Sequence, residues 1–144
     1  MIISFDVFGL PAPQGSKRHV GNGVMIETGG DKLKAWRDAV RVDSAAAMAG
    51  RSPLAGPVQL WVQFLMPRPK GHYRTGRLSD MLKDGAPIWH SSRPDIDKLL
   101  RSTLDGLKAG GVYLDDSQVA EVVAKKRYTG GAPMATIHIT DEDG

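Results

Sequence analysis

Two carboxylates lie two residues apart near the centre of the chain, at Asp95 and Asp97, and a basic residue, Arg101, follows one helical turn later. A second acidic pair, Asp115 and Asp116, comes after a Gly-Gly break. Carboxylate oxygens are the hard ligands that Mg²⁺ and Mn²⁺ prefer. A metal held in this way polarises a phosphoryl oxygen and lowers the pKa of a bound water, while a nearby cation offsets the charge of the transferring phosphate. The pattern therefore predicts a metal-dependent phosphodiesterase.

Each of these acids also has an ordinary structural explanation. Acidic residues are common in the first turn of a helix because they face the positive end of its dipole, and Asp97 and Arg101 have the spacing of an i,i+4 ion pair. Side-chain capping in a turn would account for one of Asp115 and Asp116. These explanations suffice for Asp95 and Asp97 alone. They account less well for two acidic pairs that a tight return of the chain would bring side by side.

Two stretches carry a family resemblance. Arg-Pro-Asp-Ile-Asp-Lys-Leu-Leu-Arg at 93–101 and Val-Tyr-Leu-Asp-Asp-Ser-Gln-Val at 112–119 resemble the core of the RusA family of Holliday-junction resolvases. The segments Pro-Gln-Gly-Ser-Lys at 13–17 and His-Tyr-Arg-Thr-Gly at 72–76 resemble segments of its phage-type members. The resemblance implies an α/β nuclease that works as a homodimer on branched DNA such as four-way junctions, in recombination and repair.

The resemblance also implies roles for individual residues. Asp95, Asp97 and Asp116 occupy the positions of the family's metal ligands, which implies bound Mg²⁺ or Mn²⁺. The type member has a catalytic Lys at the position of Arg101 and an Asn at the position of Lys98. The catalytic cation is therefore either Arg101 or Lys98, and position favours Arg101.

The overall composition fits a single domain over residues 1–144 with a polyanionic partner. The chain has 19 Lys and Arg against 16 Asp and Glu, a net charge of +3, and several of the acids belong to the expected metal site. The remaining surface is therefore more basic than the net charge indicates. The absence of Cys excludes disulfides and thiolate-bound zinc. No apolar run approaches the ~20 residues of a membrane span, and no signal peptide is evident. We expect a cytoplasmic protein, acting in the bacterial host cell if it is phage-encoded.

A basic, flexible loop is expected at about 67–94, where hydrophobic periodicity is lost. It contains Arg74 and Arg77 together with Tyr73 and Trp89, and loops of this length inside a domain are usually functional or disordered. We expect its cations to follow a DNA backbone and its aromatic rings to stack on exposed bases. The loop histidines, at 72 and 90, are expected to be solvated or to contact DNA.

Two further basic segments are candidates for DNA contact, with solvated surface charge as an equal alternative. One is the Pro- and Gly-rich segment that ends in Lys17 and Arg18. The other is the pair Lys125 and Lys126, which we expect near the exposed end of a strand, where charges also prevent aggregation.

Alternating and helical hydrophobic patterns predict an α/β fold with a mixed sheet of about four strands and two main helices. The strands are expected near 2–8, 58–66, 119–128 and 135–140, and the helices near 31–49 and 96–108. The Gly130–Gly131 turn predicts that the last two strands are antiparallel neighbours. Trp36 lies on the apolar stripe of the first helix and is expected in the core. Asp95 is expected at or near the N-cap of the second helix, with Asp97 in its first turn.

An alternative function is a non-catalytic protein that binds branched DNA, in which the acids only cap helices. Metal dependence separates the two. A restriction-like nuclease shares Pro94 and Asp95 but needs an acidic residue, one further residue and then Lys on a later strand. Glu121 is followed instead by Val-Val-Ala before Lys125, which excludes that class.

Overall fold

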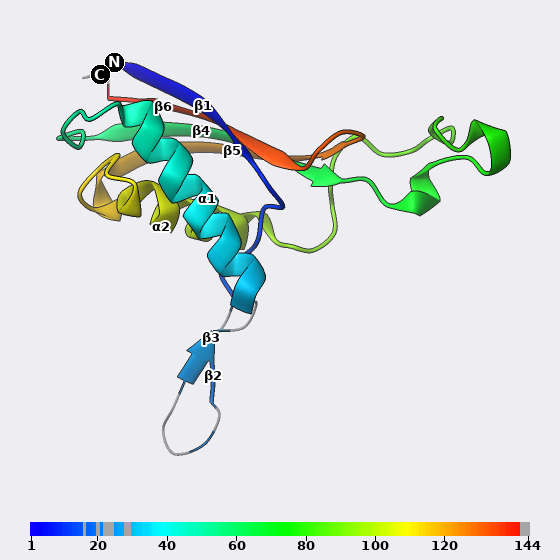
Figure 1. Cartoon of the computed structure of the whole chain (residues 1–144), viewed down its shortest axis with the longest axis horizontal. Helices are drawn as coiled ribbons and strands as arrows, with labels where there is room; N and C mark the ends of the chain where they lie inside the picture. The colour runs from blue at the N-terminus through cyan, green and yellow to red at the C-terminus, as the bar shows by residue number, and fades with distance from the viewer. Residues whose placement is uncertain (16, 20, 22–24, 28–29, 142–144) are drawn as a thin grey trace.

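A mixed sheet of four strands carries the two long helices on one of its faces (Figure 1). The computed structural model describes residues 1–15, 17–19, 21, 25–27 and 30–141. The strand order in the sheet is β1-β6-β4-β5. These elements are β1 (Ile2–Phe8), α1 (Gly30–Met48), β4 (Val58–Pro67), α2 (Ile96–Ala109), β5 (Val119–Thr129) and β6 (Met134–Thr140). The predicted α/β fold, with a four-stranded mixed sheet and two helices, is confirmed.

The alternation along β4 sets the two sides of the sheet. Every second residue, from Val58 to Met66, is buried, while the residues between them are half-buried. The buried set faces α1 and α2, and β6 adds Ala135, Ile137 and Ile139 to it. The other side of the sheet is not covered by either helix (Figure 1) and is called the open face below.

Helix α1 packs through a stripe that recurs every three or four residues. Its buried members are Leu33, Trp36, Val40, Ser44 and Met48. Trp36 is only 1% exposed, and its Nε1 donates a hydrogen bond to Thr103 Oγ1 of α2 at 3.2 Å. The prediction that Trp36 belongs to the core is confirmed.

A glycine lets the two helices approach each other closely. A Cβ atom added at Gly106 of α2 would lie 2.7 Å from Val40 Cβ of α1, closer than real Cβ contacts. The position of α2 over the sheet therefore depends on the missing side chain at residue 106.

The predicted pairing of the last two strands is wrong. β5 is the edge strand and pairs in parallel with β4, while β6 lies between β1 and β4 and is antiparallel to both. The Gly130–Gly131 turn therefore carries the chain across β4. The physical reason is that α2 lies between β4 and β5 in the sequence, and such a helical crossover joins parallel strands. The exposed residues of β5 suit an edge, whereas the alternating buried residues of β6 suit the interior.

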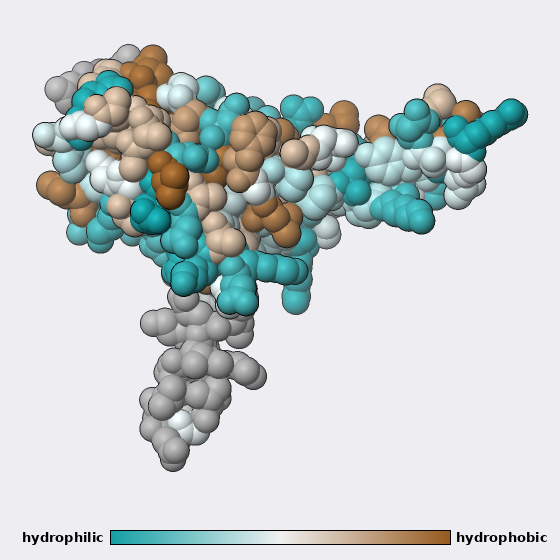
Figure 2. Space-filling model, in the orientation of Figure 1, coloured by the Kyte–Doolittle hydropathy of each residue, from teal (hydrophilic) through white to brown (hydrophobic). Residues whose placement is uncertain are grey.

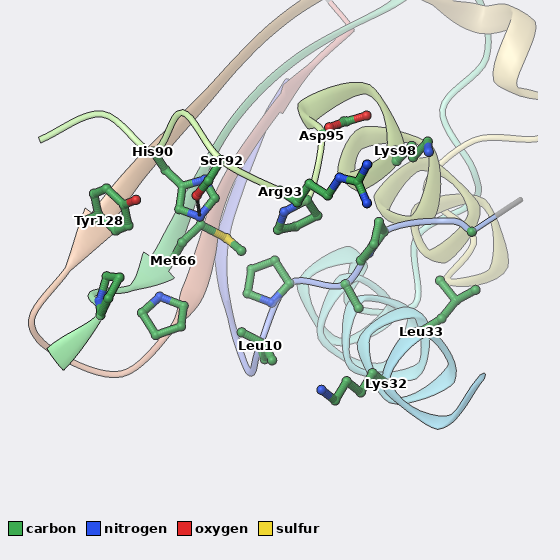
Figure 3. Close-up of a pocket in the computed structure, with 17 residues that line it drawn as sticks. Leu10, Lys32, Leu33, Met66, His90, Ser92, Arg93, Asp95, Lys98 and Tyr128 are labelled. Carbon is green, nitrogen blue, oxygen red and sulfur yellow. Dashed lines mark hydrogen bonds between the residues drawn. The ribbon is translucent and has the colours of Figure 1, made fainter. Parts of the chain in front are cut away.

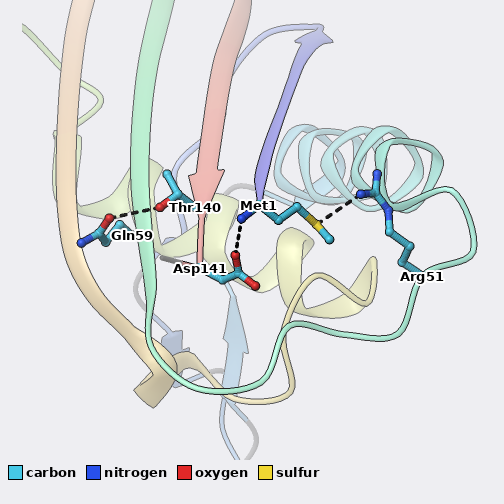
Figure 4. Close-up of polar contacts among 5 residues, drawn as sticks. All are labelled: Met1, Arg51, Gln59, Thr140 and Asp141. Carbon is cyan, nitrogen blue, oxygen red and sulfur yellow. Dashed lines mark hydrogen bonds and ion pairs between the residues drawn. The ribbon is translucent and has the colours of Figure 1, made fainter. Parts of the chain in front are cut away.

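The first and last strands are held together at one end of the sheet. The Met1 amino group lies 2.8 Å from Asp141 Oδ1 and forms an ion pair with it (Figure 4). Arg51 Nη1 lies 3.2 Å from Met1 Sδ, and Thr140 Oγ1 donates to Gln59 Oε1 of β4 at 3.1 Å. These contacts fix the end of the sheet that lies away from the long loop.

The segment 67–94 forms an arm that extends away from the sheet (Figure 1). It contains the short 3-10 helices η1 (Lys70–His72) and η2 (Gly76–Leu78). Two main-chain hydrogen bonds close the arm on itself, from Arg74 N to Met81 O at 2.8 Å and from Lys83 N to His72 O at 2.9 Å.

Residues 88–90, where the chain returns from the arm, pair with the edge of the sheet. His90 N donates to Lys126 O, and Tyr128 N donates to Ile88 O, both at 3.0 Å. The arm therefore guides the chain along β5 and into α2.

Two short strands, β2 (Lys17–His19) and β3 (Met25–Glu27), form a separate antiparallel pair that the sequence patterns did not predict. The side chains of Lys17 and Arg18 lie outside the described residues. Among the described residues, no helix is long and apolar enough to cross a membrane.

Candidate active site

The start of α2 presents a carboxylate that the helix does not use. Asp95 is the N-cap residue, with the extended backbone of a cap (φ −69°, ψ 141°), but its side chain makes no capping hydrogen bond. Asp97 lies in the first turn and is exposed. Both placements agree with the prediction. An N-cap carboxylate normally accepts a hydrogen bond from the first turn, so its free oxygens leave Asp95 available to a ligand.

Lys126 supports the backbone that leads to Asp95. Its Nζ donates to the carbonyl oxygens of Ser92 and Pro94, both at 2.7 Å. Lys126 pairs with Phe64 in the register of the sheet and therefore faces the side covered by the helices. Partial burial lowers the pKa of Lys126, and the nearby charge of Asp95 opposes this shift. The sequence pattern indicated two equivalent lysines at a strand end, but the alternation of β5 gives them different environments.

Lys125 lies on the open face instead. Its Nζ is 5.7 Å from the centroid of the Trp61 ring, which also packs against His138 with the ring centroids 4.9 Å apart. The cationic group of Lys125 therefore lies over an aromatic ring, on the side of the sheet away from Asp95. His138 points to the opposite face of β6 from its buried neighbours Ile137 and Ile139.

The two candidate catalytic cations occupy different positions on α2. Lys98 is half-buried and lines a cavity together with Asp95, whereas Arg101 is exposed. Among the ion pairs of the described residues, none joins Asp97 to Arg101. The ion pair expected from their spacing is therefore not formed, and both side chains remain available to other partners.

Asp115 is used by the turn in which it lies. It is the N-cap of η3 (Asp116–Gln118), where its Oδ1 accepts a hydrogen bond from Ser117 N at 2.9 Å. In return, Gln118 Oε1 accepts from Asp115 N at 3.0 Å, which completes a capping box. The hydrogen bonds from Ser117 lower the pKa of Asp115. The capping role expected for one acid of this pair therefore belongs to Asp115.

Asp116 lies beside Tyr113 and the middle of α2. Tyr113 is buried, and its hydroxyl donates to Leu104 O at 2.9 Å. Burial raises the pKa of Tyr113, and the charge and hydrogen bonding of Asp116 raise it further. Leu104 is two helical turns beyond Asp97, about 10 Å along the axis. The expected metal ligands are thus spread along α2, and no three His, Asp or Glu side chains among the described residues are grouped closely enough to hold a metal ion.

The carboxylates nevertheless have the donor chemistry for a hard cation. Asp95, Asp97 and Asp116 are exposed, and Asp95 makes no capping hydrogen bond. Carboxylate oxygens without strong protein partners suit Mg²⁺ or Mn²⁺. The fit is therefore one of ligand type, with Asp95 and Asp97 at one level of the helix and Asp116 further along.

A cavity of about 760 Å³ opens beside Asp95 (Figure 3). Residues 10–13, the end of β4 and the start of α2 contribute to its walls. Figure 3 shows Arg93, Asp95 and Lys98 on one side of the cavity and His90 and Tyr128 on the other. The sequence patterns did not identify this cavity, because its walls come from five separate parts of the chain.

His90 differs from the expectation of a solvated residue. It is only 9% exposed, and its ring packs against Tyr128 with the centroids 4.8 Å apart. Burial lowers the pKa of His90, and the charge of Lys126 lowers it further. The alternating residues 88–90 pair with the edge of β5, and this pairing turns the His90 ring inward.

The arm carries exposed cations and exposed apolar side chains together (Figure 2). Arg74 forms an ion pair with Asp84 at 3.2 Å and donates to Leu82 O, while Arg77 lies exposed in the last turn of η2. Trp89 is 55% exposed, and the guanidinium carbon of Arg127 is 5.2 Å from its ring centroid. The arm therefore carries cations, and where it joins β5 it adds an exposed aromatic ring beside Arg127.

The fold and the charges define a small α/β protein with free carboxylates at a helix start and a basic arm beside them. The family model described as Endodeoxyribonuclease RusA matches residues 9–140, and the chain therefore belongs to the RusA endodeoxyribonuclease family, whose members resolve Holliday junctions. A comparison with curated proteins finds no match. The resemblance that the central motifs indicated is confirmed, and the match extends over almost the whole chain.

Proposed function

We propose that this protein is a metal-dependent endodeoxyribonuclease that cuts four-way junctions or related branched DNA during recombination and repair. The match to the RusA family over residues 9–140 supports the endodeoxyribonuclease activity. The observation that supports catalysis at this site is that the carboxylate of Asp95, at the start of α2, makes no capping hydrogen bond. A purely structural N-cap residue would use its side-chain oxygens to accept hydrogen bonds from the helix.

Asp95, Asp97 and Asp116 are the residues that would hold Mg²⁺ or Mn²⁺. The ion would supply a water of lowered pKa and neutralise charge on the phosphate. Lys126 keeps the backbone before Asp95 in place through its two hydrogen bonds to carbonyl oxygens. This support orients the Asp95 carboxylate without using its oxygens.

Lys98 and Arg101 are the cations closest to these carboxylates along α2. An Arg side chain stays charged at any working pH and can contact two phosphate oxygens at once, so Arg101 suits transition-state stabilisation. Lys98 lies nearer to Asp95 at the cavity and can also donate a proton. Either side chain can offset charge that develops on the phosphate.

We further propose that the arm binds the DNA backbone and that two copies of the chain act on one junction. Arg77 is exposed on the arm, and Arg74 is half-buried beside Asp84; both cations can approach phosphates there. A homodimer would match a substrate that needs two symmetric strands cut, and two-fold dimers are the commonest oligomers. A protein with this substrate would act in the cytoplasm, including that of a bacterial host.

Cleavage assays with end-labelled four-way junctions and matched linear duplexes, in Mg²⁺, Mn²⁺ or EDTA, test this function. We expect paired nicks in the junction with either metal, no nicks in EDTA and much slower cutting of the duplex. Binding of the junction without cleavage in any metal would instead support a non-catalytic DNA-binding protein.

A further inference from the structure

The cavity beside Asp95 has a wall that is fixed before any ligand enters. The Pro-rich segment 10–13 forms one side, and two hydrogen bonds, one at Ala12 and one at the adjoining Gln14, tie this part of the chain to α2. Ser102 Oγ donates to Ala12 O at 2.6 Å, and Gln14 N donates to Lys98 O at 3.0 Å. Ala12 is buried, so this wall belongs to the core of the domain. A ligand would therefore enter a site that is largely pre-formed.

The interior of the cavity is apolar and partly aromatic. Leu10, Met66 and Pro67 contribute apolar surface, and the rings of His90 and Tyr128 pack against each other at its far side. Because His90 is buried and its pKa is lowered, the neutral ring predominates near neutral pH. Such a wall suits a flat, uncharged ring system.

The rim of the cavity is cationic, with one carboxylate. Lys32, Arg93 and Lys98 line it together with Asp95. A simple apolar ligand would leave these cations unused, and an inorganic anion would leave the apolar interior unused. A nucleotide combines a flat base, whose edge carries hydrogen-bonding groups, with an anionic phosphate.

We propose that this cavity receives one unstacked nucleotide of the DNA, with its base between the apolar walls and its phosphate at the cationic rim. The inference rests on the proposed function, because Asp95 and Lys98 belong to both sites. A base inside a cavity must leave the helical stack, which costs least where pairing is already interrupted. The cavity would therefore favour branched or unpaired DNA over an intact duplex.

The first test measures the binding of free nucleotides to the cavity, in the absence of DNA. Isotope-labelled, metal-free protein is titrated with deoxynucleoside 5′-monophosphates and, separately, with deoxynucleosides and with inorganic phosphate, while backbone amide signals are followed by NMR. We expect the monophosphates to shift signals of cavity residues such as Leu10 and His90 more than either part alone. Absence of such shifts at millimolar monophosphate would overturn the proposal.

A variant with a larger side chain in the cavity is then compared with a control variant for nucleotide binding. Leu10→Trp places a large ring at the lining, and Leu10 is 43% exposed, so the domain should tolerate it. Ile2→Trp is the matched control, because Ile2 is 65% exposed and does not line the cavity. We expect Leu10→Trp to weaken monophosphate binding about tenfold, the scale of one base-stacking interaction, and Ile2→Trp to leave it unchanged. Equal binding by both variants would contradict the assignment.

The second test places the nucleotide in DNA. Single abasic sites are introduced one at a time around the branch point of a junction, and binding is measured in EDTA so that no strand is cut. We expect one position, or its symmetry mates, where loss of the base weakens binding by wild type and Ile2→Trp about tenfold but affects Leu10→Trp little. If every abasic site has the same effect in all three proteins, the cavity does not hold a DNA base.

The two tests also separate this inference from the proposed function. Binding of monophosphates without any abasic effect would assign the cavity to a free nucleotide and overturn the DNA part. A normal abasic effect in a protein that cuts no junction would support the cavity and overturn the nuclease.

Discussion

The two acidic pairs of the chain look alike in the sequence but differ in how much of each the fold uses. Asp95 is an N-cap whose side chain makes no capping hydrogen bond, whereas Asp115 is an N-cap whose side chain and backbone both take part in a capping box. The difference shows that an acid at a helix start is not by itself a functional residue or a structural one. The hydrogen bonds that its side chain makes show which role it has, and in this respect Asp95 differs from Asp115.

The largest effect is expected from removing the carboxylates of the proposed metal site. Asp95→Asn and Asp116→Asn should each lower the single-turnover cleavage rate by at least about a thousandfold, because each removes a metal-binding charge, while junction binding is kept. Cleavage of labelled junctions under saturating enzyme measures this. Near wild-type cleavage by a folded Asp95→Asn protein would show that Asp95 is as structural as Asp115.

The next effect distinguishes the two cations on α2. We expect Arg101→Ala to lower the single-turnover rate by about a hundredfold, the scale of losing one electrostatic stabiliser, and Lys98→Ala by about tenfold. Each variant is compared with wild type for junction binding in EDTA. The reverse order would assign the catalytic role to Lys98, which shares the cavity with Asp95.

A smaller effect is expected from the support behind Asp95. Lys126→Met keeps most of the side chain but loses two hydrogen bonds to carbonyl oxygens, so it should lower the free energy of unfolding by about 1–2 kcal/mol. Cleavage should fall as well, because the backbone before Asp95 is released. Lys125→Met, on the open face, is the control, and denaturant unfolding of both proteins gives the comparison. Equal destabilisation would mean that the two lysines are interchangeable.

The smallest effect is expected at Asp115. Its pKa is lowered in the folded state, so its contribution to stability is present above the ordinary value of 3.8 and is lost as the pH falls through the lowered value. Asp115→Asn can still cap η3 and should keep cleavage close to wild type, but its stability should depend less on pH in this acidic range. Unfolding curves between neutral pH and pH 3 test this, and loss of cleavage on the scale of Asp116→Asn would remove the distinction between the pairs.

The elements of the fold could be predicted because their signals are local. The alternation from Val58 to Met66 and the apolar spacing around Trp36 identified β4 and α1 almost to the residue. The pairing of the strands could not be predicted in the same way, because it depends on contacts between distant segments. The Gly130–Gly131 turn predicted a hairpin, but the helical crossover between β4 and β5 required a parallel pair and moved β6 inside the sheet.

The candidate site was predicted only where one segment determines it. The spacing from Asp95 to Arg101 placed these residues on α2, and the missing ion pair to Asp97 depends on side-chain positions that spacing does not define. The inward direction of His90 depends on how residues 88–90 pair with β5, and that of Lys126 depends on the register of β5 against β4. The cavity depends on five segments that are separate in the sequence.

The close contact between Gly106 and Val40 has a consequence for mutational surveys of this protein. A side chain at residue 106 would push α2 away from α1 and displace every carboxylate that α2 carries, although the glycine itself lies in the core. Selection for activity would therefore mark Gly106 as intolerant, and it would be mistaken for a functional residue. Activity regained by pairing Gly106→Ala with Val40→Gly, which removes the Cβ atom that the added methyl group would meet, would identify Gly106 as a spacer between helices.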